Sequence, residues 1–317
     1  MHEPHGSTPA ATVLVLGGSG FIGRHAVAAL EARGCRVVIG SRFPQRRLRR
    51  ATDSRAEYRP IRLERLLDPT DWHEALRGCD VVINCVGILR QRGRETYDRI
   101  HHRAPAALAA ACRVRGLRLI HVSALGLDPG ARSGFLRSKL DGEAALRASG
   151  ADWRIVRPSL LDGDGGFGAR WIRRVARWPL HVLPADALGR IAALDVGDLG
   201  EAIARLALST EPGEDREYDL GGLHARTLAE QLAAMRALHT DKPALQLAIP
   251  AWLARLASHA CDLLHVTPYS FGHWELLRRD NCPRHNRLSE LLGRAPREIG
   301  RTPMPIPAPL GQPGAIV

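Results

Sequence analysis

The sequence predicts an α/β fold, in which a doubly wound parallel sheet carries a smaller, mostly helical C-terminal part. Short apolar runs that suit strands buried on both faces alternate with longer stretches that suit helices, which is the pattern of βαβ units. A glycine-rich turn follows the first apolar run directly. The chain has 317 residues, 45% of them hydrophobic, so it can bury a sizeable core without disulfide or metal staples.

The first 160 residues contain the regular alternation. Continuous apolar runs bounded by glycine or polar residues indicate strands, and periodic stretches that end near glycine indicate helices. The segment 41–57 is rich in arginine and predicts no regular element. We expect strands at 12–16, 36–39, 58–63, 80–85, 117–122 and 153–156, and helices at 21–33, 69–76, 95–115 and 135–148.

The pattern is looser after Pro158. Six of the eight residues 161–168 are Gly or Asp, which predicts a loop, and residues 169–190 show no clear period. Asp195 and Asp198 are expected to cap and begin a helix. We expect helices at 195–208, 227–237, 250–265 and 270–279, a strand at 218–220, and irregular ends at 1–10 and 302–317, the latter rich in proline.

The charge balance favours an anionic partner. There are 45 basic residues against 33 acidic ones, a net charge of +12, and only Lys139 and Lys242 are lysines. A nucleotide cofactor and an anionic membrane surface both fit this charge, as does a solvated arginine-rich surface with no partner. The chain has no zinc-finger spacing and no platform of interleaved arginine and aromatic residues, which argues against nucleic-acid binding.

The placement of cysteine and histidine residues predicts the redox state of the compartment and whether the protein binds a metal ion. Six cysteines are scattered without a CxxC pair, which predicts a reducing, cytoplasmic setting and no disulfide framework. The histidines form no HxxxH pattern and no cluster with cysteine, so we expect no metal site. No uncharged apolar run reaches the length of a membrane span, so membrane contact would be peripheral.

The motif Gly17-Gly18-Ser19-Gly20-Phe21-Ile22-Gly23 lies between the first predicted strand and the first predicted helix. The first glycine of such a motif permits the tight turn, the second lets the backbone approach a diphosphate, and the third lets the helix pack on the strand. Free amides and the positive end of the helix dipole favour an anion there. The motif therefore predicts dinucleotide binding.

The residues after the second strand bear on which dinucleotide binds. A fold that binds NAD(H) places Asp or Glu there for the ribose hydroxyls, whereas this chain has Ser41 and Arg42. A guanidinium group can stack on adenine and hold a 2′-phosphate. The sequence therefore favours NADP(H), and NAD(H) stays open. Further arginines, which equally suit a solvated loop, follow at Arg46, Arg47, Arg49 and Arg50.

Two further segments are expected beside the cofactor. Asp68 follows the third strand, where it either accepts a hydrogen bond from the adenine amine or caps the helix at Pro69. The backbone at the end of the fourth strand must pass close to the cofactor. The residues concerned are Cys85, Val86 and Gly87.

Several motifs together resemble the short-chain dehydrogenase/reductase superfamily over about residues 11–220. The resemblance is to its extended, atypical branch, which includes proteins like the NAD-dependent epimerases and dehydratases and the nucleotide-binding accessory subunit of respiratory complex I. It is carried by the glycine motif, Val122-Ser123-Ala124-Leu125-Gly126, Ser138-Lys139, Gly142-Glu143, Arg157-Pro158-Ser159 and Asp195-Val196-Gly197-Asp198.

The resemblance implies roles for single residues. Ser123 would orient the substrate, Lys139 would bind the nicotinamide ribose, and Pro158 would lie beside the nicotinamide. The family's catalytic Tyr precedes the Lys by four residues, but Phe135 stands there and has no ionisable proton. A substitute acid would have to come from elsewhere, and Tyr97 is our candidate. Asp162 and Asp164 are further candidates, and His121 suits a core position.

These observations lead to two hypotheses on function. The first is an NADP(H)-dependent oxidoreductase, or an epimerase/dehydratase-like enzyme, with an unknown small-molecule substrate. The second is a non-catalytic NAD(P)-binding scaffold, assembly factor or redox sensor. A homodimer stays open, as does peripheral membrane contact by the apolar stretch 250–264. We expect a Rossmann core at 11–160 to which 191–222 return, a substrate or partner part at 161–190 and 223–301, and a tail at 302–317.

Overall fold

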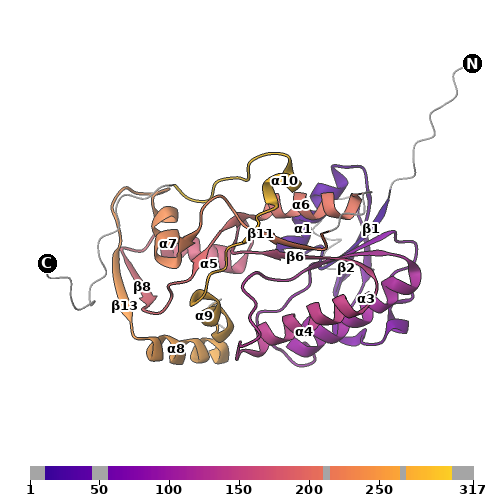
Figure 1. Ribbon diagram of the computed structural model, residues 1–317, viewed down its shortest axis with the longest axis horizontal. Helices are drawn as coiled ribbons and strands as arrows, with labels where there is room; N and C mark the ends of the chain where they lie inside the picture. The colour runs from indigo at the N-terminus through magenta and orange to yellow at the C-terminus, as the bar shows by residue number, and fades with distance from the viewer. Residues whose placement is uncertain (1–10, 45–55, 210–214, 265–268, 302–317) are drawn as a thin grey trace, which may run out of the picture.

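A parallel seven-stranded sheet lies at the centre of the molecule (Figure 1). The computed structural model describes residues 11–44, 56–209, 215–264 and 269–301. The strand order is β11-β6-β5-β4-β1-β2-β3, so the order reverses between β1 and β4, where the carboxyl ends of the strands leave a crevice. The strands are β1 (Thr12–Leu16), β2 (Arg36–Ser41), β3 (Glu57–Pro60), β4 (Val81–Asn84), β5 (Arg118–Val122), β6 (Asp152–Pro158) and β11 (Glu217–Leu220).

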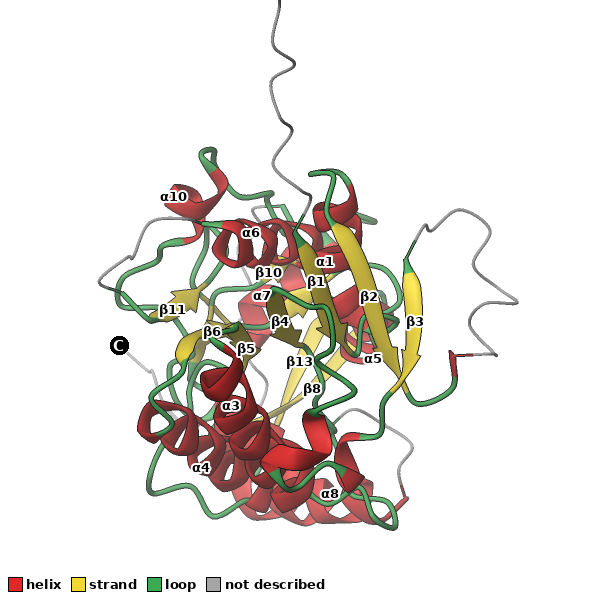
Figure 2. Ribbon diagram, turned by 90° about the vertical axis from the view of Figure 1, so that its right-hand side faces the viewer, coloured by secondary structure: helices red, strands yellow, loops and turns green. Residues whose placement is uncertain are grey.

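Helices cover both faces of this sheet, as Figure 2 shows. Alternate residues of β1 face opposite sides: Val13 and Val15 join one buried cluster, and Leu14 and Leu16 join the other. Because strands buried on both faces are apolar throughout, they appear in the sequence as continuous hydrophobic runs. The doubly wound parallel fold is confirmed. On one face lie α1 (Phe21–Glu31) and α6 (Val196–Leu208), and on the other α3 (Ala104–Arg115) and α4 (Gly134–Ala148).

Several helices and two strands that do not flank the large sheet gather at one end of the molecule (Figure 1). Two strands, β8 (Leu180–Pro184) and β13 (Leu245–Ile249), pair in parallel there. The predicted division of the chain into a core and a substrate part stays a prediction. The helices of this end are α5 (Phe167–Ala176), α7 (Leu228–Arg236), α8 (Ala251–Leu264) and α9 (Phe271–Leu277); α10 (Leu288–Leu292) packs on α6, and the short pairs are β7 (Leu161–Asp162) with β10 (Leu194–Asp195) and β9 (Arg190–Ile191) with β12 (Arg226–Thr227).

The structure corrects the predicted helix at 95–115. Regular α-helix begins only at Ala104, and the preceding segment η3 (Asp98–Arg103) is π-helical. Pro105 has no N–H, so the usual hydrogen bond to the carbonyl of His101 cannot form. Gly142 of α4 packs against that carbonyl, where an added Cβ would lie 1.9 Å from the oxygen.

Other segments also differ from expectation. The helix expected at 69–76 is a 3₁₀ turn, η2 (Pro69–Trp72), after the 3₁₀ turn η1 (Leu63–Arg65). The loop expected at 161–168 contains β7 and the start of α5, and the unassigned stretch 169–190 forms the rest of α5, β8 and the start of β9. Strand β13 escaped prediction because its apolar side chains are half exposed. Within the described ranges, no helix is long and apolar enough to cross a bilayer.

Candidate functional site

The glycine turn between β1 and α1 is closed by backbone contacts. Gly17 has a φ of 72°, in the left-handed region, and its N–H donates to the carbonyl of Gly40 at 3.0 Å. The Gly20 N–H donates to the carbonyl of Gly17 at 2.8 Å. A Cβ added at Gly23 would lie 2.3 Å from the same oxygen, so only glycine fits there without backbone movement.

The amino end of α1 suits an anion. Its N-cap residue is Gly20, which has no side chain to cap the helix, and the first turn holds no acidic residue. The first amides and the positive end of the helix dipole are therefore available to a diphosphate. Ser19 is half-buried beside them, and Ile22 packs against the core. The predicted diphosphate cradle thus has a backbone geometry and charge that fit the group.

The end of β4 packs directly against this turn. A Cβ added at Gly17 would lie 3.0 Å from Val86 Cγ2 and 3.5 Å from the carbonyl of Cys85. Burial raises the pKa of the Cys85 thiol to about 12, so the thiol is neutral. These residues therefore form a wall of the crevice and bring no thiolate chemistry to it.

A second glycine-rich segment packs over the start of α1. A Cβ at Gly166 would lie 2.6 Å from the Phe21 ring, and one at Gly165 would lie 2.4 Å from the Arg24 guanidinium group.

The carboxylate of Asp162 accepts from Arg173 at 2.7 and 2.8 Å, and Asp164 pairs with the same arginine at 2.8 Å. Both acids, which we considered as catalytic candidates, are thus held in an ion-pair cluster with α5.

Arg42 and Ser41 lie at the end of β2. Arg42 forms an ion pair with Glu95, and Ser41 Oγ accepts from the N–H of Phe43 at 3.4 Å. The ring of Phe43 packs under the guanidinium group of Arg62, 5.6 Å from its centroid. Sequence reasoning missed Arg62, which tertiary packing brings to this edge. The neighbouring arginines 46, 47, 49 and 50 lie outside the described residues.

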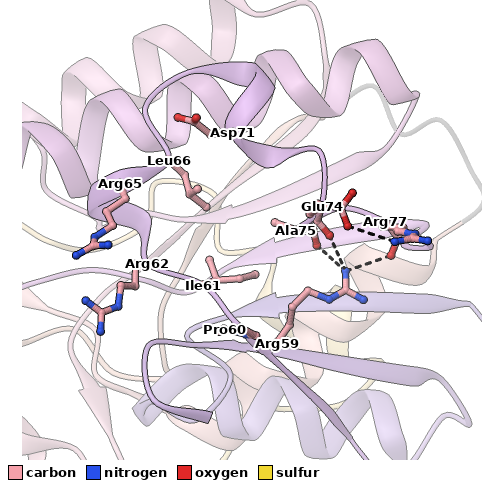
Figure 3. Close-up of a pocket in the computed structure, with 10 residues that line it drawn as sticks. All are labelled: Arg59, Pro60, Ile61, Arg62, Arg65, Leu66, Asp71, Glu74, Ala75 and Arg77. Atoms are coloured by element: carbon pink, nitrogen blue, oxygen red, sulfur yellow. Dashed lines mark hydrogen bonds and ion pairs between the residues drawn. The ribbon is translucent and has the colours of Figure 1, made fainter.

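A cavity of about 560 Å³ opens beside β3 (Figure 3). Arg62 and Arg65 extend to the same side of it, and neither forms an ion pair among the residues that the structure describes. At its other end, Arg59 donates to the carbonyl of Ala75 at 2.7 Å. The cavity is therefore a basic hollow next to the strand ends where the adenine half of a dinucleotide is expected.

Asp68 caps the 3₁₀ turn η2. Its carboxylate accepts from the N–H and the hydroxyl of Thr70 at 2.9 and 2.6 Å, and these bonds lower its pKa. Asp71 accepts in return from the Asp68 N–H at 3.0 Å, which completes a capping box. The capping alternative considered for Asp68 therefore holds, and its contact with adenine stays a prediction.

Lys139 and Ser123 are buried polar groups that face the crevice. The Lys139 ammonium group makes no hydrogen bond to a described residue, and burial lowers the Lys139 pKa to about 8. The buried Ser123 hydroxyl makes no hydrogen bond of regular geometry. It is nevertheless close enough to Glu143 to help lower the pKa of that carboxylate. A Cβ added at Gly87 would lie 3.9 Å from Lys139 Nζ, which places the end of β4 beside this lysine.

Glu143 anchors an ion-pair cluster beneath these groups. It accepts from Arg157 Nε and Nη2 at 2.8 and 2.7 Å and from Arg147 at 2.9 Å, and it is 1% exposed. Despite burial, these cations lower the Glu143 pKa, so the carboxylate is charged and supports the charge on Lys139. Arg157 also pairs with Glu217 and Asp219 of β11, at 2.6 and 3.1 Å.

His121 is neutral, with a defined tautomer. The Val86 N–H donates to Asn84 Oδ1 at 3.1 Å, which orients the amide so that its NH₂ donates to His121 Nδ1, also at 3.1 Å. The proton of His121 therefore lies on Nε2. Burial lowers its pKa to about 4. As expected from the sequence, His121 is a satisfied core residue.

Phe135 lies in an aromatic cluster made by three separate elements. Its ring centroid is 5.6 Å from that of His101, 5.8 Å from that of Tyr97 and 5.9 Å from that of His273. Gly272 of α9 also packs on the ring, at 3.0 Å from an added Cβ. Sequence reasoning missed His273, since no motif marks it and it is 138 positions from Phe135. The position of the expected Tyr is thus covered by α9.

The other groups around Phe135 already have partners. The Ile88 N–H donates to His101 Nε2 at 3.1 Å, so its Nδ1 bears the proton and faces Ser138 Oγ at 3.0 Å. The Tyr97 hydroxyl donates to the carbonyl of Leu89 at 2.8 Å, and burial raises its pKa. Tyr97 therefore brings its ring to the site, and its catalytic role stays a prediction. Pro158 ends β6, where its carbonyl accepts from the Leu125 N–H at 3.0 Å.

Comparisons with known proteins agree with this geometry. Residues 17–174 match a family described as NAD(P)H-binding. The chain is 32% identical over 189 residues to a ceramide reductase of Caulobacter vibrioides, a match that covers 59% of this chain and 57% of the relative. It is 30% identical over 223 residues to (4-alkanoyl-5-oxo-2,5-dihydrofuran-3-yl)methyl phosphate reductase of Streptomyces griseus, covering 70% of this chain and 72% of that one.

A further relative and a solved structure extend the comparison. The chain is 28% identical over 224 residues to a mitochondrial NADH dehydrogenase alpha subcomplex subunit of Dictyostelium discoideum, covering 69% of this chain and 62% of the subunit. It thus spans about three fifths of the Caulobacter and Dictyostelium relatives. A UDP-glucuronic acid 4-epimerase from Bacillus cereus, solved with UDP-glucuronic acid and NAD, has the same fold, with a TM-score of 0.63, 17% identity and coverage of 90% and 94% of the two chains. The chain therefore belongs to the NAD(P)H-binding family of Rossmann proteins.

Proposed function

We propose that this protein is an NADPH-dependent reductase of a carbonyl group on an apolar substrate. The observation that carries the proposal is a pair of buried polar side chains at the crevice: Lys139, whose ammonium group makes no hydrogen bond to a described residue, and Ser123, whose one polar neighbour is Glu143. A buried polar group without a partner is costly, so such groups in a native site mark a place for a ligand. A ribose hydroxyl on Lys139 and a carbonyl oxygen on Ser123 would satisfy both.

The residues present suit reduction without a catalytic Tyr. When bound, the nicotinamide would supply the hydride that reaches the carbonyl carbon. Ser123 would donate a hydrogen bond to the carbonyl oxygen and so orient it. The pKa of Lys139, about 8, is close to the pH at which a proton donor works best. Lys139 would give a proton to the ribose hydroxyl that it binds, and that hydroxyl would give its own proton to the carbonyl oxygen. Phe135, packed under α9, would exclude water from that step.

Three cations support the preference for NADPH. Arg42 is half exposed at the end of β2, and Arg62 and Arg65 reach the hollow beside β3 without ion pairs among the described residues. Arg62 also lies on the face of Phe43. A guanidinium group can hold a 2′-phosphate by paired hydrogen bonds, whereas the hydroxyl of NADH offers no charge. The pairing of Arg42 with Glu95 leaves Arg62 as the better placed cation.

The substrate class rests on the relatives. The Caulobacter and Streptomyces relatives carry the name of a reductase, and the first of these names a ceramide, which is a lipid. The described part of the crevice adds an aromatic surface made by Phe135, Tyr97 and His273. An apolar carbonyl compound fits this surface better than a sugar nucleotide does, because the aromatic rings offer few hydrogen bonds.

The chain provides a matched pair of variants for the test. Lys139→Met removes the buried ammonium group, and Lys242→Met removes the one other lysine, which is exposed. Oxidation of NADPH would be followed with long-chain ketones and aldehydes. We expect turnover in the parent and the Lys242 variant, and a loss of about a hundredfold or more in the Lys139 variant. Equal turnover in both variants would contradict the proposed role of Lys139.

A second candidate function is a non-catalytic NAD(P)-binding module, such as a scaffold, an assembly factor or a redox sensor. The observation that favours it is Phe135, which has no proton to give and lies buried at the position of the family's Tyr. Names of complex I subunits among the relatives fit this reading. Tight NADPH binding by calorimetry without oxidation by any carbonyl compound would favour the module over the reductase.

A further inference from the structure

The outer face of α8 is apolar along its length. Only Ala254 and Ser258 of this helix are buried, whereas Trp252 is 69% exposed, Leu256 59% and Leu264 69%. Residues at this spacing lie on one face of a helix. A face of this kind on a water-soluble monomer usually marks a binding surface.

The short sheet before α8 continues this apolar character. In the parallel register, Leu245 lies beside Leu180 and Leu247 beside Val182, and all four side chains are at least 41% exposed. Pro250 connects β13 directly to α8. We call this set the apolar surface; its members are Leu180, Val182, Leu245, Leu247, Trp252, Leu253, Leu256 and Leu264.

Exposed cations without an ion pair among the described residues lie next to the apolar surface, whereas the nearby exposed Asp241 pairs with Arg301 at 3.3 Å. On α8 itself the exposed cation is Arg255. The acid of this helix, Asp262, turns toward the protein, where it accepts from the Phe271 N–H at 2.9 Å and pairs with Arg90 at 3.4 Å. Lys242, just before β13, is exposed and has no ion pair within the described part of the chain.

We infer that the apolar surface binds an anionic lipid bilayer, with α8 lying in the plane of the interface. A helix with a broad apolar face, a Trp and flanking cations is the kind that inserts between headgroups and acyl chains. Anionic lipid headgroups attract such cations, and the whole chain carries a net charge of +12. Pairing of two copies through this surface would bring together two chains that each carry a net charge of +12, whereas an anionic bilayer offers the opposite charge.

The binding surface lies next to the candidate site. Helix α8 packs on α9, and α9 places His273 and Gly272 against the Phe135 ring. Docking through α8 would therefore bring α9, which covers the site, close to the membrane. The role of the membrane in delivering substrate rests on the proposed function, because an apolar carbonyl substrate dissolved in the bilayer would then reach the site from the membrane side.

Vesicle flotation with the full chain tests the inference. The vesicles would contain phosphatidylcholine alone or with phosphatidylglycerol, and the variant would be Leu256→Ser with Leu264→Ser. Val114→Ser is the matched control, because Val114 is 84% exposed on α3, away from α8. We expect binding to the anionic vesicles, weakening as salt rises, and a loss of about tenfold or more in the double variant alone.

Two results would overturn the inference. One is an absence of binding to anionic vesicles, and the other is dimerisation in solution that the same double substitution abolishes. The proposed function is judged separately, by NADPH oxidation with a short, water-soluble ketone. If the double variant keeps that activity and vesicle binding never occurs, the bilayer inference fails alone. If the protein binds anionic vesicles but reduces no carbonyl compound, the proposed function is wrong and the bilayer inference is supported.

Discussion

The Lys139 ammonium group lies 5.7 Å from the centroid of the Phe135 ring, one turn away on the same face of α4. A buried cation thus faces an aromatic ring where the family's pattern would place a phenol. The ring gives some electrostatic support but accepts no conventional hydrogen bond from the ammonium group. The free protein therefore holds this charge at a cost in stability, which a ligand with hydroxyl groups would reduce.

Substitution of Lys139 by Met should stabilise the ligand-free protein. The lysine pKa falls from 10.5 to about 8 on folding, so between these values the unfolded chain binds more protons and stability rises with pH. At pH 7 the protonated lysine lowers the free energy of unfolding by about 3 kcal/mol relative to a neutral group of the same size. Urea unfolding of the parent and the Lys139→Met variant should show this difference in the free energy of unfolding at pH 7. The difference should disappear as the pH rises from 8 to 10.5. A less stable Met variant at pH 7 would contradict the burial of an unpartnered charge.

Glu143→Gln should destabilise the protein strongly. The carboxylate pairs with Arg157 and Arg147 while almost fully buried, and its loss leaves two cations without their partner. Breaking a buried pair of this kind costs about 3 to 5 kcal/mol. Because the pKa of Glu143 is lowered on folding, its contribution is present at neutral pH and is lost as the pH falls below about 4.5. Glu57→Gln, at an exposed position, is the control and should lower the free energy of unfolding by at most about 1 kcal/mol in the same assay.

Gly23→Ala should abolish dinucleotide binding. Its Cβ would lie 2.3 Å from the carbonyl oxygen of Gly17, so the turn that cradles the diphosphate must open. Gly168 of α5 has open space around it, and alanine there should be neutral or stabilising by up to about 1 kcal/mol. Calorimetry with NADPH separates the two variants at a temperature where circular dichroism shows both folded. Unchanged affinity in the Gly23 variant would mean that the dinucleotide binds elsewhere.

Arg62→Ala should weaken NADPH binding by about tenfold and leave NADH binding unchanged. The guanidinium group beside Phe43 has no ion pair among the described residues, and it would contribute to the affinity only through the 2′-phosphate. Arg36→Ala is the matched control, since Arg36 is exposed and pairs with Glu57 at 3.2 Å on the same sheet edge. Fluorescence titration with both coenzymes gives the ratio of the NADPH and NADH dissociation constants for each variant. An equal loss for both would place Arg62 on the adenine and not on the phosphate.

Tyr97→Phe should leave most of the reductase activity intact. The Tyr97 hydroxyl is engaged with the carbonyl of Leu89, and burial raises its pKa, so it is a poor proton donor in this arrangement. The steady-state kcat and its pH profile are the measurements. A fall of a hundredfold with the profile altered would instead make Tyr97 the substitute acid that the sequence suggested.

Much of the fold was predictable because the responsible signals are local. Strands β1 and β4 are short, mostly apolar runs, since a parallel strand between two layers of helices has no polar face. The turn at Gly17 and the helix after it follow from residues within a few positions of one another. The same holds for the lysine at 139 and the missing phenol at 135, which share one helix face.

Contacts between distant segments were not predictable in this way. His273 stacks on Phe135 across more than 130 positions, and Arg62 meets Phe43 through the pairing of β2 with β3. Strand β13 was missed since its leucines face outward, contrary to the usual pattern. Backbone preference and hydrophobic period act over a few residues, and they determined the order of elements and the glycine cradle. Which polar groups stay unpartnered in the crevice, and which apolar face stays open to a membrane, depends on how remote elements pack, and no short stretch of sequence contains that information.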